Sequence, residues 1–233
     1  MKPLAVIVGA NSQIAKAMIE RWRDHYELIG IGRGPSGPGA LNEYWQSDYS
    51  EVSLARVALA VAPRAPTLVF CAVGHLHSDT QMPEKKLADL ERETLSHYFE
   101  INAVIPAMVL KYFVPCLDRA ASARVVFLSA KVAGISDNRL GGWYGYRASK
   151  AALNMLIKTA SIELARSHRK ACLIALHPGT TATPLSAPFS KSLPPEKLFS
   201  AELTAERLCG VIEELSAEDN GRFVHWDGTD LPW

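Results

Sequence analysis

Residues 4–15 read Leu-Ala-Val-Ile-Val-Gly-Ala-Asn-Ser-Gln-Ile-Ala, five apolar residues that end at a glycine and pass into a helical pattern. The run 4–8 has the length and composition of a short buried strand. From Ile14 onward, apolar residues recur at steps of three and four, which predicts a first helix to about Tyr26. Gly9 at the junction permits a tight turn, and the helix N-terminus then offers free N–H groups to a phosphate. The stretch predicts the first strand–helix unit of an α/β domain.

The same alternation continues along the rest of the chain. Apolar runs predict further strands at 27–31, just before Asp48, and at 67–71, 124–128, 171–176 and 223–226. Helical patterns predict helices from Ser50, as N-cap, to Ala62, and at 95–117 with a kink at Pro106, 144–167 and 204–215. Strands that alternate with helices favour a doubly wound parallel sheet of the Rossmann type. Because no linker or repeat divides the 233 residues, we expect a single domain, 1–233.

Composition limits the partners and the compartment. The chain has 25 basic and 24 acidic residues, so its net charge of +1 gives no reason to expect nucleic acid or an anionic membrane as a partner. No stretch approaches the roughly 20 apolar residues of a spanning helix, and 4–8 is too short for a signal peptide. The four cysteines are scattered without a C-x-x-C pair, and His75 and His77 form only a weak H-x-H signal in a glycine-flanked loop. We therefore expect reduced thiols, no metal site and a cytoplasmic protein.

The strongest chemical signal is Tyr146-Arg147-Ala148-Ser149-Lys150. Residues four apart share one face of a helix. A neighbouring ammonium favours the phenolate and lowers the pKa of a tyrosine from its ordinary value of about 10. Such a phenol suits a general acid/base that acts on a carbonyl or an alcohol.

Seven pieces of sequence stand in an order that points to a known family. They are Gly9–Ala15, Asp48, Cys71–Gly74, Asn102, Ser129, the pair Tyr146/Lys150 and Pro178–Thr183. In these pieces the sequence resembles the short-chain dehydrogenase/reductase family over nearly the whole chain. Residues 136–154, 177–189 and 221–233 resemble the C-factor-like branch of that family. The resemblance implies an oxidoreductase that moves hydride between a nicotinamide cofactor and a carbonyl or alcohol substrate.

The resemblance assigns catalytic roles to four residues. Tyr146 would exchange a proton with the substrate oxygen, and Ser129 would polarise the carbonyl. Lys150 would bind the nicotinamide ribose and lower the pKa of Tyr146. Asn102 would hold a water in a proton relay behind Lys150, close to Pro106, where the helix already lacks one backbone hydrogen bond.

The resemblance also implies a set of cofactor-binding residues. They are Gly9, Asn11, Ser12, Gln13, Ile14, Arg33, Asp48, Gly74, Pro178, Gly179, Thr181 and Thr183, together with Tyr146 and Lys150. An acidic residue at the end of the second strand selects NAD through the ribose hydroxyls. This sequence has Arg33 there and no acid, and a guanidinium can pair with a 2′-phosphate. NADP(H) is therefore the preferred cofactor and NAD(H) the alternative. Asp48 would contact the adenine edge, and Thr183 the carboxamide or the pyrophosphate.

Three departures from the family pattern leave alternatives open. Gln13 and Ala15 replace the second and third glycines of the first turn, so Gln13 could crowd the phosphates or donate hydrogen bonds to them. The catalytic serine could be Ser129, 17 residues before Tyr146, or Ser136, 10 residues before it. Ser129 is preferred because it ends a predicted strand. The turn 71–74 keeps only the final glycine of the family's Asn-rich turn.

Residues 184–200 interrupt the strand–helix rhythm with four prolines and two phenylalanines, Phe189 and Phe199, that look exposed. Because this segment follows the carboxyl end of a strand, where open α/β sheets bind ligands, it is a candidate substrate lid. Substrate specificity would lie near 134–144 and 184–200. The helix from Leu95 has more apolar surface than one sheet contact needs, and the resemblance implies a homodimer or a homotetramer.

Two functions of different classes are compatible with the sequence. We expect an NADP(H)-dependent enzyme that reduces a small-molecule carbonyl or oxidises the matching alcohol. The alternative is a dinucleotide-sensing or signalling protein with little or no turnover, which the altered first turn and the C-factor resemblance suggest.

Overall fold

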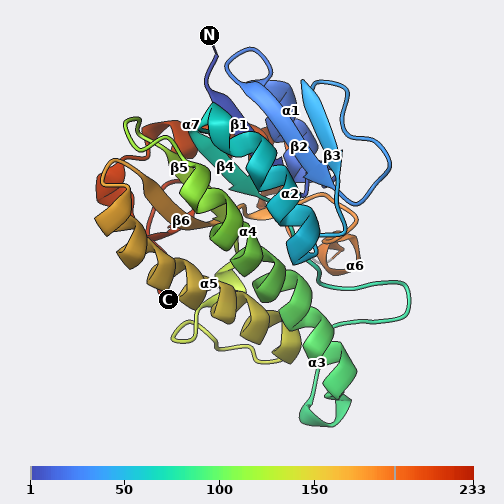
Figure 1. Cartoon of the computed structure of the whole chain (residues 1–233). Helices are drawn as coiled ribbons and strands as arrows, with labels where there is room; N and C mark the ends of the chain where they lie inside the picture. Colours follow the sequence, from blue (N-terminus) through green and yellow to red (C-terminus); the bar gives the residue numbers. More distant parts are fainter. Residues whose placement is uncertain (1, 192) are drawn as a thin grey trace.

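The computed structural model describes residues 2–191 and 193–233 and has a central sheet of seven parallel strands. The strand order is β3-β2-β1-β4-β5-β6-β9 (Figure 1). These strands are β1 Leu4–Val8, β2 Glu27–Gly32, β3 Glu43–Gln46, β4 Leu68–Cys71, β5 Arg124–Leu128, β6 Cys172–His177 and β9 Phe223–His225. This order confirms the predicted doubly wound Rossmann-type sheet. The chain builds the sheet outward from β1 through β2 to β3 and then crosses to β4 on the other side of β1. The carboxyl ends of β1 and β4 therefore form the topological switch point where such sheets bind ligands.

Helices cover both faces of the sheet. Helices α2 (Glu51–Val61), α4 (Ile105–Phe113) and α5 (Tyr144–Ser167) lie on the front face in Figure 1. Helices α1 (Gln13–Trp22) and α7 (Ala201–Glu214) pack against each other on the back face. The predicted N-cap Ser50 accepts a hydrogen bond from the Ser53 backbone N–H, which satisfies one of the open donors of α2.

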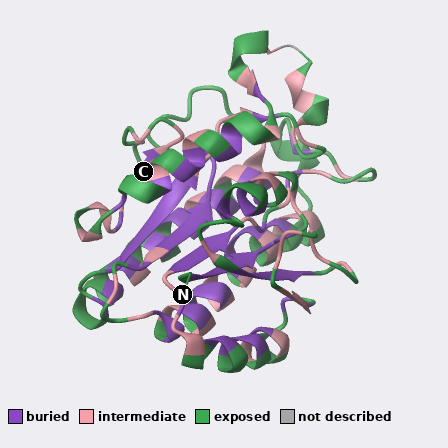
Figure 2. Cartoon of the chain, turned by 90° about the horizontal axis from the view of Figure 1, so that it is seen from above, coloured by how far each residue is buried: buried purple, intermediate pink, exposed green. Residues whose placement is uncertain are grey.

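The strands are buried because both sheet faces are covered. Along β1, Val6 and Val8 belong to the core under α2, α4 and α5, whereas Ala5 and Ile7 belong to the core under α1 and α7. The buried sheet lies between two layers of helices in Figure 2. Burial of an aliphatic side chain of this size stabilises the fold by about 1.5–3 kcal/mol, so the continuous apolar runs fix the central strands.

The predicted helix 95–117 consists of four pieces, the last of which is a 3₁₀ turn at Val114–Cys116. Helix α3 spans Arg92–Phe99, a π-helical segment spans Glu100–Val104, and α4 follows. Pro106 has no N–H to donate to the carbonyl of Asn102, four residues earlier, and the Ile105 N–H donates to the Glu100 carbonyl, five residues earlier. The proline is thus accommodated by one wider turn, at the place where the sequence predicts a kink.

The run Arg92–Cys116 is also the one candidate for a membrane span among the described residues. Its best 18-residue window has a mean hydropathy of 1.3, which comes closer to a spanning helix than the composition suggested. The core helix of a water-soluble protein passes the same test, and 39% of this window is buried inside the protein. Here α3 packs against α5, and α4 packs against α2.

The predicted lid, 184–200, is more ordered than expected. It contains the short helix α6 (Ala187–Ser190) and the strand β8 (Leu198–Phe199), which pairs with β7 (Thr180–Thr181); residue 192 lies outside the described residues. Phe199 is buried, contrary to expectation, because it packs on the Trp226 ring and under the Arg207 guanidinium, 4.1 Å from the Phe199 ring centre.

Candidate active site

The first turn lies at the carboxyl edge of the sheet. Gly9 has a φ of 82°, and a Cβ at this position would come within 3.0 Å of the backbone of Ala72 and Val73. Glycine therefore allows the turns after β1 and β4 to approach each other closely. Ser12 caps α1 by accepting a hydrogen bond from the Ala15 N–H (3.2 Å).

Asn11 organises the neighbouring loop. Its side-chain amide donates to the Ser36 carbonyl (2.9 Å), and its side-chain oxygen accepts from the Tyr44 hydroxyl (2.9 Å). A side chain on Gly32 would overlap the Asn11 amide. The end of β2 and the first turn are thereby held together around the same edge.

Two adjoining cavities collect six of the fourteen predicted cofactor residues. The first, about 380 Å³, is lined by Gly9, Asn11, Ser12, Arg33, Asp48 and Gly74, and also by Gly34, Tyr49, Ala72, Val73, Ile101 and Ile105. The second, about 520 Å³, shares Arg33 and Asp48 and adds Gln46, Ser47, Ser50, Val52, Ser53 and Arg56. The cavities run from the first turn over the ends of β2 and β3.

Several residues that line these cavities were not predicted from the sequence. Ile101 and Ile105 flank Asn102 and give the first cavity an apolar wall, and Tyr49 follows Asp48 directly. Arg56 lies one turn into α2, in the second cavity. Only their proximity in sequence to predicted residues could have indicated them.

Gln13 and Thr183 lie apart from these cavities, in a neighbouring cavity of about 470 Å³ between the start of α1 and the lid. Gln13 is exposed, at the first position of α1. The Thr183 N–H donates to the Ser186 hydroxyl (3.1 Å). Ile14 is partly buried against the core.

The segment after β6 is fixed by contacts with β8, α7 and Trp226. Pro178 precedes Gly179, which has a φ of 75° and lies where a side chain would come within 2.9 Å of Phe199 and Trp226. Thr181 is buried, and its hydroxyl is hydrogen-bonded to the Thr204 hydroxyl of α7 (2.8 Å). The Thr181 side chain therefore anchors this loop to α7.

Lys150 is almost fully buried, with 4% of its surface exposed. Its ammonium donates to the Leu128 carbonyl at the end of β5 (2.9 Å). A Cβ on Gly74 would lie 3.4 Å from Lys150 Nζ, which places the ammonium beside the first cavity. Burial lowers the pKa of Lys150 to about 8.

Tyr146 lies one helical turn before Lys150 and is 7% exposed. Its ring packs edge-on against Trp143 and Tyr98, with ring centres 6.1 and 6.4 Å apart. Burial raises the pKa of Tyr146, which is the reverse of the shift we expected. Desolvation of the phenolate is the main cause, and the neighbouring Tyr98 acts in the same direction.

Ser129 and Ser136 lie in different surroundings. Ser129 directly follows β5, is buried, and donates to the Asn154 side-chain oxygen (2.6 Å). Asn154 stands one turn after Lys150, so Ser129 faces the buried side of α5 that also carries Tyr146 and Lys150. Ser136 is exposed and lies 3.5 Å from the Trp233 carbonyl.

Asn102 holds the loop after β4. Its side chain accepts from the His75 N–H (2.8 Å) and donates to the His75 carbonyl (2.9 Å) and the Ser149 hydroxyl (3.0 Å). The amide is thus engaged by protein groups that join the loop to α5. The backbone carbonyl of Asn102 remains the group that Pro106 leaves without a helical donor.

An aromatic cover lies over Tyr146. Phe189 of α6 packs on Trp143 and His77, with ring centres 4.7 and 5.6 Å apart. The His77 side chain is also hydrogen-bonded to the Pro184 carbonyl (3.0 Å). The lid therefore rests on the residues around the phenol. In the part of the chain that the structure describes, no three His, Cys, Asp or Glu side chains are grouped to hold a metal.

A Rossmann-type sheet with cavities at its switch point is typical of dinucleotide-binding proteins, and a buried Tyr–Lys pair lies beside these cavities. Comparisons with known proteins agree. A sequence model described as short chain dehydrogenase matches residues 67–193. An uncharacterised oxidoreductase of Schizosaccharomyces pombe is 30% identical over 97% of this chain and 96% of its own length.

The C-signal protein of Myxococcus xanthus is 32% identical over 63% of this chain and 83% of its own length. Among solved structures, NADPH-bound carbonyl reductase from chicken fatty liver has a TM-score of 0.83 and 21% identity, with both chains covered in full. The chain belongs to the short-chain dehydrogenase family, as the resemblance implied.

Proposed function

We propose that this protein is an NADP(H)-dependent oxidoreductase in which Tyr146 exchanges a proton with the oxygen of a carbonyl or alcohol substrate. The observation that carries the proposal is the buried face of α5, where Tyr146, Lys150 and Asn154 succeed one another at single helical turns. This face meets Ser129 at the end of β5 and lies beside the cavity at the switch point.

The residues of the cavities fit a dinucleotide. Gly9 and Gly74 leave room for close approach, Ile101 and Ile105 supply an apolar wall for a base, and the N-terminus of α1 offers N–H groups to a phosphate. Arg33 would hold the 2′-phosphate, with Arg56 in the same cavity as a second cation. Asp48 would accept a hydrogen bond from the adenine edge. When bound, the nicotinamide supplies or accepts the hydride.

The chain's own residues then handle the proton. In reduction, the phenol of Tyr146 donates its proton to the substrate oxygen. The Ser129 hydroxyl, once turned from Asn154 Oδ1 toward the substrate, polarises the carbonyl. Lys150 holds the nicotinamide ribose, and the Asn102 backbone carbonyl holds a water that returns the proton. Burial raises the pKa of Tyr146, so the phenol carries its proton before reaction and can act as the general acid in reduction.

The surroundings of Tyr146 favour apolar substrates. Its neighbours are Leu76, Tyr98 and Ala130, with Val132, Trp143 and Phe189 partly buried against them. Apolar walls of this kind bury a neutral organic molecule and leave few groups to pair with a charged one. We infer a neutral carbonyl compound of small or medium size, enclosed by the lid of a single domain.

Replacement of Tyr146 by phenylalanine tests the function. We expect Tyr146→Phe to lower kcat for an apolar ketone, aldehyde or quinone by about 10²–10⁴-fold, because it removes only the general acid. The dissociation constant for NADPH, measured by nicotinamide fluorescence, should stay within about twofold, since the ring is retained. Turnover at the wild-type rate would refute the assignment.

A dinucleotide sensor is the second candidate, favoured by Gln13 in place of a glycine and by the similarity to C-signal. Titration with NADPH and NADH, followed by a screen of aldehydes, ketones and quinones, separates the two functions. Tight binding without turnover supports the sensor, and binding of neither nucleotide points to a scaffold with a vestigial site.

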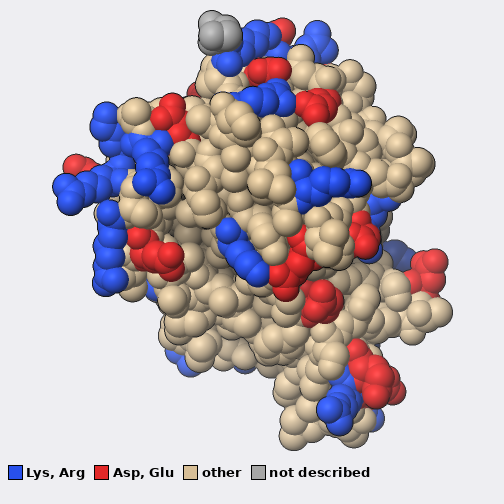
Figure 3. Space-filling view, in the orientation of Figure 1, with Lys and Arg blue, Asp and Glu red and all other residues tan. Residues whose placement is uncertain are grey.

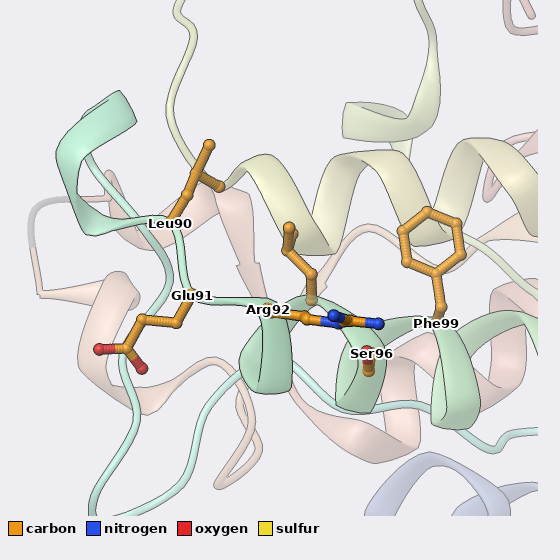
Figure 4. A pocket seen from close by; sticks show the side chains of 6 residues that line it. Leu90, Glu91, Arg92, Ser96 and Phe99 are labelled. Atoms are coloured by element: carbon orange, nitrogen blue, oxygen red, sulfur yellow. The ribbon is translucent and has the colours of Figure 1, made fainter.

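We also propose a homodimer or a homotetramer formed through the face of α3, the π-helical segment and α5. Exposed apolar side chains there are Phe99, Val104, Met155, Leu156 and Ile162. The centre of this face carries few charged side chains (Figure 3). A surface cavity of about 430 Å³ at the start of α3, lined by Leu90, Glu91, Arg92, Leu95, Ser96 and Phe99, continues the surface (Figure 4).

Light scattering on the purified protein tests this assembly, and a monomer at all concentrations would contradict it.

The compartment is inferred from the cysteines. All four are free and buried, which suits a reducing compartment such as the cytoplasm.

A further inference from the structure

Glu84 is a buried carboxylate that none of the roles above uses. It lies in the loop between β4 and α3, and 3% of its surface is exposed. Its Oε1 atom is buried and has no hydrogen-bond partner among the described residues. A buried carboxylate is costly without compensation, so the hydrogen bonds of its other atoms indicate what keeps it buried.

Those contacts all go to the first turn of α5. The Trp143 N–H donates to the Glu84 backbone carbonyl (2.5 Å), and the Gly145 N–H donates to Glu84 Oε2 (3.1 Å). One residue therefore binds the backbone on both sides of Tyr144, where the helix begins.

Helix α5 has no N-cap side chain of its own. Trp143 occupies the N-cap position with a φ of 54° and makes no side-chain capping bond, and the first turn contains no acidic residue. The first N–H groups of a helix need acceptors from outside the helix. Glu84, 61 residues before Gly145, supplies one of these acceptors.

Close packing reinforces this contact. A Cβ on Gly145 would lie 2.8 Å from Glu84 Oε1 and would overlap the Tyr98 ring. Because residue 145 is glycine, the Glu84 carboxylate and the Tyr98 ring of α3 can pack directly against the backbone of α5. The loop after β4, α3 and the start of α5 meet at this point.

We propose that Glu84 is a positioning residue that fixes the first turn of α5 and, through it, the phenol of Tyr146. The proposal depends on the proposed role of Tyr146, which directly follows Gly145. Lys150 is anchored separately, one turn later, by the Leu128 carbonyl. Loss of the Glu84 contact should therefore displace the phenol and leave the cofactor-binding part of α5 in place.

Three substitutions of Glu84 separate the effect of side-chain length from the effect of the negative charge. Glu84→Gln keeps an oxygen acceptor at the same reach without the charge, and we expect kcat within about threefold of wild type. Glu84→Asp keeps the charge but is one methylene shorter, and Glu84→Ala removes the acceptor. For both we expect kcat to fall by about 10²-fold, the loss typical of a misplacement of about 1 Å. NADPH affinity should change by less than about twofold.

Amide hydrogen exchange of a peptide that covers residues 143–147 gives a readout independent of activity. We expect faster exchange in Glu84→Asp and Glu84→Ala, and wild-type exchange in Glu84→Gln. Ser216→Ala, which removes a cap of the short helix Ala217–Asp219, is the control. It should lose stability without a change in kcat or in the exchange of residues 143–147.

The outcomes are distinct. Equal loss of kcat in the Gln and Ala variants would overturn the proposal, because charge and not the hydrogen bond would then be decisive. Wild-type kcat in all three, or a parallel loss of NADPH binding, would overturn it as well. If Glu84→Ala does not fold, the comparison of Gln with Asp decides. An inactive wild-type protein would contradict the proposed function alone, and the exchange rates would then show whether Glu84 holds α5.

Discussion

Single side chains at the end of β2 set the choice of dinucleotide. Arg33 borders both cavities, and the described part of β2 ends without an acidic side chain. A hydrogen bond to a charged group contributes about 1.5–3 kcal/mol. The Arg33 guanidinium should therefore favour a dinucleotide with a 2′-phosphate over one without.

We expect Arg33→Ala to raise KM for NADPH by roughly 10- to 100-fold, the equivalent of that energy. KM for NADH should change little, because NADH has no phosphate at this position. Arg92→Ala, at an exposed site on α3, is the control. Equal effects on both cofactors would show that Arg33 does not read the phosphate.

For single residues, the sequence predicted which side chains lie together better than it predicted their pKa values. The spacing of Tyr146 and Lys150 placed both on one buried face of α5. It could not show that the ammonium would bond to the Leu128 carbonyl, because that acceptor lies on β5, 22 residues away. The direction of the Tyr146 pKa shift was also predicted wrongly, because it follows from the burial of the phenol in the folded protein.

Among the elements, the lid has the least regular structure, and it contacts the residues around Tyr146 through one aromatic side chain. Phe189 joins α6 to Trp143 and His77 above Tyr146. Phe189→Ala should raise KM for an apolar carbonyl substrate by roughly 10-fold, since an aromatic pair contributes about 0.5–1.5 kcal/mol beyond the apolar area that it buries.

The matched control is Leu185→Ala on the same segment, where the side chain is exposed. Steady-state kinetics with saturating NADPH should show little change for this variant. If the two variants behave alike, Phe189 does not cover the substrate.

Periodicity predicted the elements that pack on the sheet and missed those set by distant partners. Helix α5 begins and ends where its pattern predicted. The π-helical segment 100–104 could not be foreseen, because a proline is compatible with a kink, a break or a wider turn. Phe199 seemed exposed because the residues that bury it, Arg207 and Trp226, come from α7 and the end of β9.

For the whole molecule, His177 couples stability to pH. It ends β6, beside the His225 ring, with ring centres 5.4 Å apart. Burial lowers its pKa to about 3, and the nearby His225 and Lys131 act in the same direction. The unfolded chain binds a proton below the ordinary histidine pKa of about 6.5, whereas the folded protein does not. Stability present above pH 6.5 is therefore lost as the pH falls toward 3.

We expect His177 to cost about 1.4 kcal/mol for each pH unit below 6.5, or roughly 2 kcal/mol at pH 5. Urea denaturation at pH 7 and pH 5 measures the loss. Other groups also titrate in this range, so the difference from His177→Gln isolates the contribution of this residue. The variant should lose less stability on acidification, and equal losses would contradict the assignment.

The overall architecture was the most predictable level. Strands that alternate with helices admit few arrangements, because parallel crossovers are right-handed and lie on the sheet faces. The cavities consequently lie at the switch point between β1 and β4. The shape of the substrate pocket could not be predicted, because it depends on how Trp143 and Phe189 meet across 46 residues of chain.

The burial of all four thiols makes this protein suited to site-directed labelling. Cys71, Cys116, Cys172 and Cys209 are shielded in the folded protein, so a maleimide dye should react at one introduced surface cysteine alone. Leu140, 92% exposed in the loop that precedes α5, is a natural place for it. A fluorophore there would report ligand-induced changes in the loop that leads to Trp143 and the start of α5.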